Sequence, residues 1–370
     1  MKIIKSLLLT AIAAAAGSAS AQSSVALYGT IDQYFNYMRS SSGASYTGME
    51  DGAFLRSRMG FRGTEDLGGG LTVKFVLERG FNALNGSPAD ASRGFDRQSW
   101  VGLGTSWGDF RIGRQNGVVF GRGDYIDYTS RTLGSMINNF GVPSRYDNDI
   151  AYISPRWNGL LFELHYALAE TTNGISRQGV AQYGLDYLNG PFRIGYAGMH
   201  GSAPPNALYP AAVKYDNVYA NYDYGKGKVY LAYVRSNNST ATAISNNAGT
   251  ILGNVGGVVA GTNPDVNRNY NIWQISADYR IASNLRVGAL WGRISDTSDT
   301  GHDATGGSVA AYYDLSKRTM IYGIVQTLRN GPNAGFRFGG SAALPTNFTN
   351  PRDINGQTLR GAHVGVLHRF

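Results

Sequence analysis

Segments of alternating apolar and polar residues follow one another along nearly the whole chain, and short and long links alternate between them. In WQISADYR (273–280), for example, Trp, Ile, Ala and Tyr alternate with Gln, Ser, Asp and Arg. A period of two is typical of β-strands with one apolar and one polar face. We count sixteen such strands, joined by seven short turns and eight long loops. The period alone would also fit a soluble sandwich, but this alternation of links favours an outer-membrane β-barrel.

The lipid solvent then requires the sheet to close. In hydrocarbon every backbone N–H and C=O must be paired internally, so an open sheet edge is not viable. The first strand (25–37) must therefore pair with the last, which ends at Phe370. The predicted outward set on the last strand is Ala362, Val364, Val366, His368 and Phe370. We expect the polar His368 and the aromatic Phe370 at the level of the lipid headgroups.

The first 21 residues have the layout of a secretory signal peptide. Two lysines precede an apolar run (7–16), and Ala-Ser-Ala follows at 19–21. The run is shorter than the roughly 20 residues that span a bilayer. We therefore predict a signal peptide over 1–21 and one β-barrel domain over 22–370, with a formal charge of 31 − 25 = +6. The chain has no cysteine, which excludes disulfides and thiolate metal sites. We predict no metal and no cofactor.

The long loops are the segments in which the sequence is least regular. They include 38–52, 116–147 and 329–357, and 237–267 is a low-complexity stretch of Asn, Gly, Thr and Ser. We expect 237–267 to be a solvated outer loop. The segment 116–147 is longer than most loops without secondary structure, and such loops are usually functional or disordered.

Four segments resemble, in the same order, the general porins of beta-proteobacterial outer membranes. They are VALYGTID (25–32), the glycine-rich 57–81, RQSWVGLGTSWGDFRIGRQNGVVF (97–120) and HVGVLHRF (363–370). The resemblance implies an all-β, sixteen-stranded antiparallel barrel, a homotrimer, and a third long loop, here 116–147, that folds into the lumen. It also implies that the barrel-assembly machinery reads the last strand through Phe370, with Val366 and His368 beside it.

Arginines alternate with apolar residues in the second predicted strand. Arg56, Arg58 and Arg62 have one parity, and Leu55, Met59 and Phe61 have the other. An arginine facing lipid costs about 2–4 kcal/mol at the bilayer midplane, so these arginines are expected to line the lumen. By the same parity argument Arg97 is expected to point inward, opposite to Trp100. Lys74 is predicted to be lumen lining, together with Arg56 and Arg62.

The resemblance also implies a pore constriction with a basic wall and an acidic loop. Its predicted residues are Arg58, Arg97, Arg145, Asp124 and Asp127. Opposed charges would create a field across the narrowest point of the pore. The sequence departs from the enterobacterial pattern at Thr30, where a lysine often stands, and at Arg131, near a usual acidic position. Arg114 matches a position that accepts an acidic residue from a neighbouring subunit, here predicted to be Asp90.

We therefore predict a passive outer-membrane diffusion channel for small hydrophilic solutes, and not an enzyme. The charge of +6 and the arginine wall predict a preference for anions. A substrate-specific channel, for example for organic acids, remains open, as does a non-conducting structural or adhesin barrel. A barrel enzyme would need a Ser-His pair or acid cluster on the rim, which we do not find. Predicted partners are outer-membrane lipid and lipopolysaccharide, and no nucleic acid.

Overall fold

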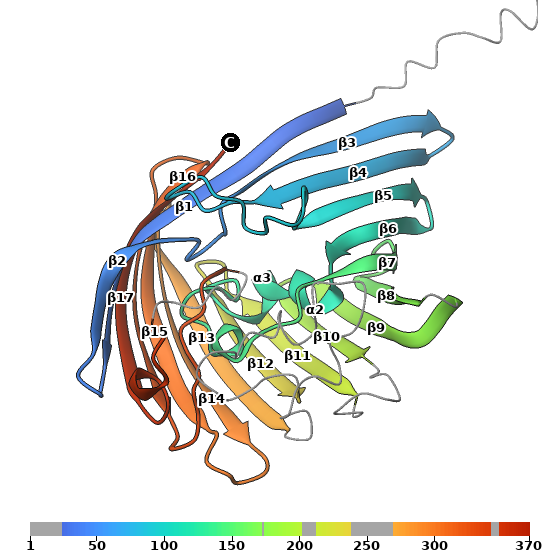
Figure 1. The fold of residues 1–370 in the computed structure, drawn as a ribbon. Coiled ribbons are helices and arrows are strands. Elements are labelled where there is room, and N and C mark those ends of the chain that lie inside the picture. The colour runs from blue at the N-terminus through green and yellow to red at the C-terminus, as the bar shows by residue number, and fades with distance from the viewer. Residues whose placement is uncertain (1–23, 172–173, 202–211, 238–268, 342–347) are drawn as a thin grey trace, which may run out of the picture.

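The computed structural model describes residues 24–171, 174–201, 212–237, 269–341 and 348–370. Its strands are β1 (Ser24–Ser40), β2 (Ser45–Asp51), β3 (Arg58–Gly68), β4 (Leu71–Gly80), β5 (Gln98–Thr105), β6 (Gly108–Asn116), β7 (Arg145–Ile153), β8 (Leu160–Thr171), β9 (Gly174–Asn189), β10 (Phe192–Gly201), β11 (Val213–Asp223), β12 (Lys228–Ser236), β13 (Tyr270–Ala282), β14 (Leu285–Asp296), β15 (Ala304–Asp314), β16 (Thr319–Asn330) and β17 (Thr358–Arg369). All pairings are antiparallel, and β1 pairs with β17, so the sheet closes into a barrel (Figure 1).

Seventeen strands form sixteen positions in this barrel, because β2 and β3 share one position. Both pair with β1, β2 over 33–39 of β1 and β3 over 24–30. The predicted sixteen-stranded barrel is therefore confirmed. The prediction of a long loop over 38–52 is wrong, because β1 continues to Ser40 and β2 returns along it after a short turn.

The interruption between β2 and β3, residues 52–57, bends into the barrel. The buried carboxylate of Asp32 causes it, since Oδ2 accepts hydrogen bonds from the N–H groups of Phe54 and Leu55, each at 2.7 Å. The Ser57 Oγ accepts from the Asp32 N–H at 3.0 Å. Phe54 reaches the ring of Tyr312 on β15, with centroids 5.5 Å apart. This segment, named the β2–β3 break below, therefore narrows the lumen.

Closure of the barrel reaches the last residue. The backbone of Phe370 exchanges two hydrogen bonds with Gly29 of β1, each 3.1 Å long. A Cβ atom at position 29 would overlap with Cζ of Phe370, so only glycine leaves room for this ring. Phe370 is 41% exposed, and Val364 and Val366 are exposed on the same face of β17. His368 is also exposed, and its Nδ1 lies 2.9 Å from the Thr319 Oγ1.

A long internal segment, residues 117–144, follows the inner wall of the barrel. It contains the short helices α2 (Val118–Gly121), α3 (Gly123–Ile126) and α4 (Met136–Phe140). These helices contact successive groups of strands: α2 contacts β8 to β10, α3 contacts β11 and β12, and α4 contacts β13 to β15. Figure 1 shows α2 and α3 inside the ring of strands. We call residues 117–144 the inward loop.

The link between β16 and β17 also folds inward, which the sequence analysis did not predict. It carries the single-turn helix η2 (Pro351–Asp353), and before it Phe336 and Phe338 are fully buried. Asn138 of α4 donates hydrogen bonds from Nδ2 to the carbonyl oxygens of Gly339 and Gly340, at 2.6 and 2.9 Å. We call residues 334–341 the C-terminal inward segment.

Two predictions concern residues outside the described ranges. The signal peptide over 1–21 lies outside them, as does nearly all of the low-complexity stretch 237–267. Both stay predictions, and so does the single domain over 22–370. Within the described part of the chain, no helix has the length and apolar character needed to cross a membrane.

Candidate pore constriction

Two of the predicted wall arginines flank one carboxylate on the inner face of the barrel. The Arg97 Nε lies 2.7 Å from Oε1 of Glu78, and the Arg58 Nε lies 3.5 Å from its Oε2. Tyr28 of β1 donates to the same Oε2 at 3.0 Å. The backbone N–H of Arg97 also donates to the Glu78 carbonyl at 3.1 Å. Glu78 therefore fixes the position of both guanidinium groups.

Arg97 lies inside the barrel, but the parity argument used for it fails. Strand β5 begins at Gln98, so Arg97 precedes the strand. The alternation of side chains within a strand therefore does not determine where Arg97 points. Trp100, predicted on the opposite face, is in register with Val76 and Gly113 on the inner face. The Arg111 guanidinium lies over its ring, 4.6 Å from the centroid. Arg97 points inward because of Glu78, and not because of alternation.

Two further arginines enclose one aromatic ring of the inward loop. Arg145, at the start of β7, and Arg131, in the loop, have Cζ atoms 4.7 and 4.4 Å from the centroid of Phe120. Such contacts are attractive because the ring face carries partial negative charge. Burial lowers the pKa of the Arg131 guanidinium, and Tyr215, Asp127 and Asp124 oppose this shift. Arg131 remains a cation at neutral pH, since arginine does not lose its proton in proteins.

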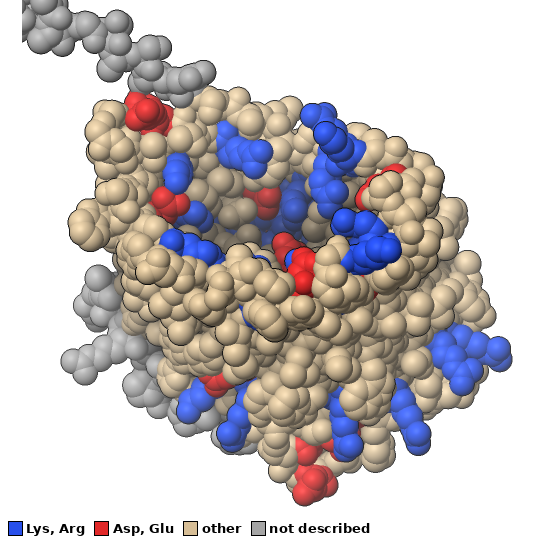
Figure 2. Space-filling model, turned by 180° about the vertical axis from the view of Figure 1, so that it is seen from behind, with Lys and Arg blue, Asp and Glu red and all other residues tan. Residues whose placement is uncertain are grey.

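These groups border a polar pocket of about 250 Å³ between the wall and the inward loop. The wall contributes Arg58, Glu78 and Arg97, and the loop contributes Phe120, Asp124 and Arg131. Leu55 of the β2–β3 break and Ser341 of the C-terminal inward segment also line it. The structure thus brings together Arg58, Arg97 and Asp124 of the predicted set. In the space-filling view a hollow carries both basic and acidic side chains at its rim and inside it (Figure 2).

Asp127 does not line this pocket, although it was predicted as part of the acidic wall. It is 1% exposed, and its Oδ1 accepts hydrogen bonds from the N–H groups of Thr129 and Arg131 at 2.8 and 3.0 Å. Its Oδ2 accepts from the Ser135 Oγ and the Gln274 Nε2, both at 2.7 Å. The carboxylate is turned into the loop because these donors converge there. Its role is to hold the loop together and attach it to β13.

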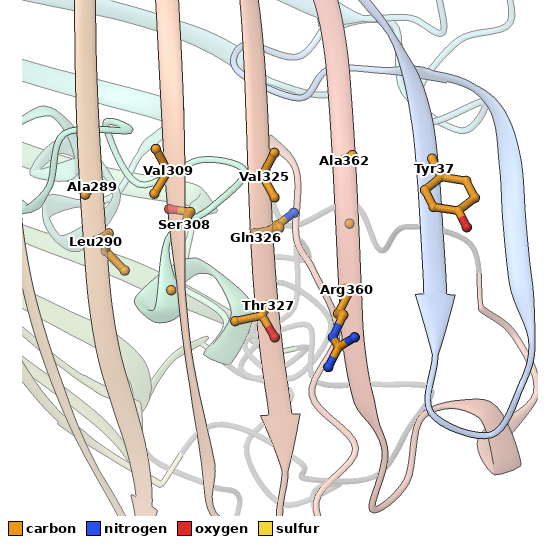
Figure 3. Close-up of a pocket in the computed structure, with 12 residues that line it drawn as sticks. Tyr37, Ala289, Leu290, Ser308, Val309, Val325, Gln326, Thr327, Arg360 and Ala362 are labelled. Atoms are coloured by element: carbon orange, nitrogen blue, oxygen red, sulfur yellow. The ribbon is translucent and has the colours of Figure 1, made fainter.

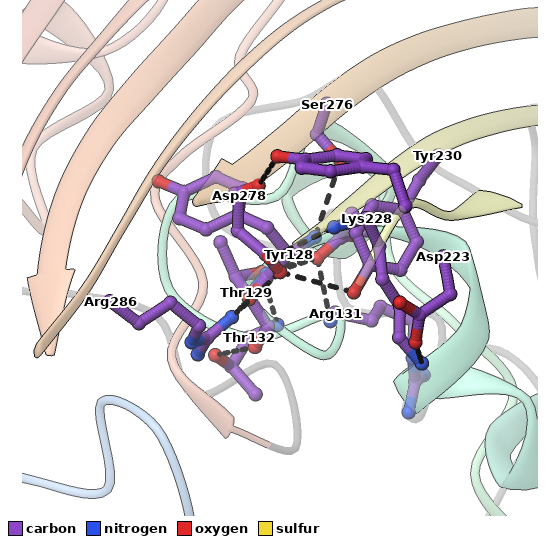
Figure 4. Close-up of polar contacts among 12 residues, drawn as sticks. Tyr128, Thr129, Arg131, Thr132, Asp223, Lys228, Tyr230, Ser276, Asp278 and Arg286 are labelled. Atoms are coloured by element: carbon purple, nitrogen blue, oxygen red, sulfur yellow. Dashed lines mark hydrogen bonds and ion pairs between the residues drawn. The ribbon is translucent and has the colours of Figure 1, made fainter. Parts of the chain in front are cut away.

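A second group of polar contacts attaches the inward loop to β13, β14 and β15, and Figure 4 shows Tyr128 beside Ser276, Asp278 and Arg286 of the first two strands. The Tyr128 N–H donates to the Ser276 Oγ at 3.2 Å, and the Tyr128 hydroxyl lies 2.9 Å from the Ser308 Oγ. Arg286 donates from Nη1 to the Tyr128 carbonyl at 2.9 Å and pairs with Asp278 at 3.1 Å. The loop is therefore fixed by polar bonds along its length.

The residues predicted as general lumen lining have different surroundings. Arg56 lies in the β2–β3 break and not in a strand, so its predicted strand parity does not apply. Arg62 is exposed on the inner face of β3, with its Cζ 5.3 Å from the centroid of Tyr28. Lys74 is bonded to Asp109 of β6, with Nζ 2.8 Å from Oδ1.

Arg114 is bonded within its own chain. Its Nη1 lies 2.6 Å from Oδ1 of Asp147, whose Oδ2 binds Arg93 at 2.9 Å. Asp90 pairs with the same Arg93 at 3.3 Å. Asp147 thus supplies a carboxylate to Arg114 from the same chain. A contact between Arg114 and Asp90 of a neighbouring subunit stays a prediction.

Sequence reasoning missed Glu78, Phe120 and the C-terminal inward segment, and it noted Arg131 only as a departure from a pattern. Glu78 could have been found, because it shares its parity with Lys74 in LTVKFVLERG (71–80). Phe120 and the C-terminal inward segment carry no local signal that separates them from other loop residues.

Comparison with known proteins places this geometry in one family. A family model described as Gram-negative porin matches residues 8–333. An outer membrane porin of Bordetella pertussis is 31% identical over 86% of this chain and 92% of its own length. The outer membrane porin protein 32 of Delftia acidovorans is 28% identical over 99% of both chains.

Solved structures agree with the fold. The anion-selective porin from Comamonas acidovorans superposes with a TM-score of 0.72 at 23% identity, covering 94% of this chain and 100% of that one. With a family model matching most of the sequence and a closed antiparallel barrel, this chain belongs to the Gram-negative porin family of outer-membrane channels.

Proposed function

We propose that the protein is a passive, anion-preferring diffusion channel for small hydrophilic solutes, and that it selects by size and by an Arg/Asp constriction. The observation that carries the proposal is the pocket between the wall and the inward loop, where Arg58, Arg97 and Arg131 outnumber the acidic side chains. Asp124 is the exposed acid on the loop side. The name of the anion-selective relative from Comamonas acidovorans supports the sign of this preference.

The charge balance at the pocket explains the expected sign. Arg58, Arg97 and Arg131 line the pocket, and Arg145 lies over the ring of Phe120 beside it, which gives four cations. Glu78 and Asp124 provide two anions, because Asp127 is turned into the loop. A narrow passage with low-dielectric walls focuses such a field and raises the local concentration of counter-ions. Anions are therefore expected to enter more readily than cations of similar size.

The test is the reversal potential of single channels in a planar bilayer under a salt gradient. Wild-type protein should give a potential of anionic sign. Arg58→Gln and Arg97→Gln should each move it toward zero, and the double variant should move it further. Arg62→Gln is the matched control, because Arg62 lies on the same face of β3 but outside the pocket. A cationic potential for the wild type, or an equal shift in the control, would refute the constriction.

A substrate-specific channel is the second candidate, and one observation favours it. Among the residues that the structure describes, the buried Arg145 Nε and Nη2 and the Arg131 Nε find no hydrogen-bond partner. Paired guanidinium donors suit carboxylates, which they can bind with two parallel hydrogen bonds. Block of the current that saturates with one organic acid, but not with chloride, would favour this candidate. Absence of any conductance would instead favour a structural or adhesin barrel.

The proposal includes a trimeric state and assembly through the last strand. We expect folded protein to migrate as a trimer in a detergent gel without heating and as a monomer after heating. We also expect the barrel-assembly machinery to read β17, because its outward residues end at Phe370. A monomeric mass in detergent by light scattering would contradict the trimer.

A further inference from the structure

One tryptophan of the barrel faces the lumen and not the lipid. Apolar side chains of the strands mostly face outward, as Val309 and Val325 do on neighbouring strands (Figure 3). Trp100 of β5 instead lies on the inner face, in register with Val76 of β4 and Gly113 of β6. Its ring is half-buried, so part of it borders the lumen. Selection by charge alone has no need for an aromatic ring at this place.

Two glycines make room for this ring on the inner face. At Gly113, where φ is +125°, an added Cβ would lie 2.9 Å from Cα of Trp100. At Gly102 an added Cβ would lie 3.4 Å from Cζ3 of the ring and 2.9 Å from Cγ of Arg111. The ring therefore extends over Gly102, toward the short turns. Because Gly102 is in register with Lys74 of β4 and Arg111 of β6, the ring lies between two cations.

Three cations surround the ring in two rows of residues that are in register across β3 to β6. Arg62 of β3 belongs to the same row as Trp100, and Lys74 and Arg111 belong to the next row toward the short turns. On these four strands neither row contains an acid. Asp109 lies in the row after them and binds Lys74 at 2.8 Å and Arg111 at 3.2 Å. The ring therefore lies in surroundings of net positive charge.

Arg62 is the cation that stays available to a ligand. It is exposed, and its Cζ lies 5.3 Å from the ring centroid of Tyr28. Within the described part of the chain it forms no ion pair and no side-chain hydrogen bond. Asp66 lies on the same face of β3, but its Oδ1 accepts from the Gly68 N–H at 2.9 Å. Two strand spacings, or roughly 10 Å, separate the Cα atoms of Arg62 and Trp100. A small ring that carries one carboxylate can bridge them.

We propose that these side chains form a binding site for aromatic carboxylates, an inference that rests on the proposed function because solutes reach the site through the lumen. We call Arg62, Lys74, Val76, Trp100 and Arg111 the Trp100 patch. The ring of the ligand packs on Trp100 and Val76, since aromatic rings attract one another in offset or edge contacts. Its carboxylate binds Arg62, because guanidinium groups match carboxylates in geometry and charge.

The composition of the Trp100 patch disfavours other classes of solute. A neutral sugar needs acceptors for its hydroxyl groups, and the patch offers cations in their place. A cationic ring would meet three like charges, and an inorganic anion would leave the aromatic surface unused. Val76 lies two residues from Glu78 along β4, or roughly 7 Å. An acid that enters from the side of the long loops therefore meets the patch directly after the constriction.

The test measures binding to full-length protein in detergent by the fluorine NMR signal of para-fluorobenzoate. Wild-type protein should bind it about three- to tenfold more tightly than cyclohexanecarboxylate, a competitor of similar size without an aromatic ring. Trp100→Leu keeps an apolar side chain and should remove this preference, whereas Trp100→Phe should retain it. Arg62→Gln should weaken the binding of both acids. Trp291→Leu, on the outer surface of β14, is the matched control and should change neither affinity.

Three results would overturn the Trp100 patch. They are equal affinity of the two acids for wild-type protein, an unchanged preference in Trp100→Leu, and unchanged binding in Arg62→Gln. A folded band in an unheated detergent gel shows that each variant has formed the barrel. Binding is measured without conduction, so any of these results beside an anionic reversal potential would remove the patch and leave the proposed function. A cationic potential would refute the proposed function, whatever the affinity for the aromatic acid.

Discussion

Replacing Asp127 by asparagine tests whether its buried carboxylate holds the inward loop in place. The hydrogen bonds fix the orientation of the new amide. Its oxygen must face the N–H groups of Thr129 and Arg131, which cannot turn away. Its nitrogen then faces the Gln274 Nε2, which is also a donor. Gln274 cannot rotate in response, because its Oε1 accepts from two backbone N–H groups of α4 at 2.9 and 3.1 Å.

The cost follows from this conflict between donors. A hydrogen bond to a charged group contributes about 1.5–3 kcal/mol, and a buried unsatisfied donor costs about 1–3 kcal/mol. The lost hydrogen bond and the unsatisfied donor belong to the same contact, so their contributions do not simply add. We expect the free energy that docks the loop to fall by roughly 2–4 kcal/mol. Since 1.4 kcal/mol is tenfold, the undocked population should rise about 30- to 700-fold. The expected signature is more current noise and more frequent changes of conductance in single-channel recordings.

Two further variants make this result specific. Asp127→Asn/Gln274→Glu should restore the low current noise of the wild type, because the new amide at position 127 would then donate to a carboxylate oxygen at position 274. Asp124→Asn removes the same charge from an exposed position on the same loop, and it should alter selectivity without adding noise. Quiet channels in Asp127→Asn, or a double variant as noisy as the single one, would refute the reasoning.

Three other variants have simpler expectations. Gly29→Ala should displace the Phe370 ring and lower the temperature at which the folded band survives in a detergent gel, at a cost of about 1–3 kcal/mol. The control is Gly323→Ala on the outward face of β16, where an added Cβ meets no close neighbour, and it should leave that temperature unchanged. Glu78→Gln should strengthen anion preference in the reversal potential, and a shift toward cations would contradict the charge balance. Asn138→Ala should expose the C-terminal inward segment to protease, and an unchanged digestion pattern would show that other contacts hold it.

The barrel could be predicted from the sequence because its main constraints are local. Lipid outside and water inside act on neighbouring residues of one strand, so the period of two appears wherever the chain crosses. The same rule predicted Arg62 on the inner face, and the structure places both Arg62 and Lys74 there. Closure followed from the need to pair the edges of the sheet.

The β2–β3 break could not be predicted in this way. GAFLRS (52–57) has the apolar and basic residues of an ordinary barrel strand. It leaves the wall because Asp32 binds two of its N–H groups, a contact over more than 20 residues. The burial of Asp127 likewise depends on Gln274, 147 residues away. Nothing in the local sequence distinguishes Asp127 from the exposed Asp124, which lies three residues before it.

The positions of the buried aromatic residues explain why the passage borders one side of the lumen. The ring of Phe140 in α4 lies 5.3 Å from that of Tyr270 on β13 and 6.2 Å from that of Phe336, centroid to centroid. These rings fill the space between the inward loop, the C-terminal inward segment and the strands behind them. The polar pocket that remains borders Arg58 and Arg97 on the opposite wall. If solutes permeate through this pocket, as proposed above, they pass close to these arginines. We infer that charge, more than width, decides the permeation rate among solutes small enough to enter.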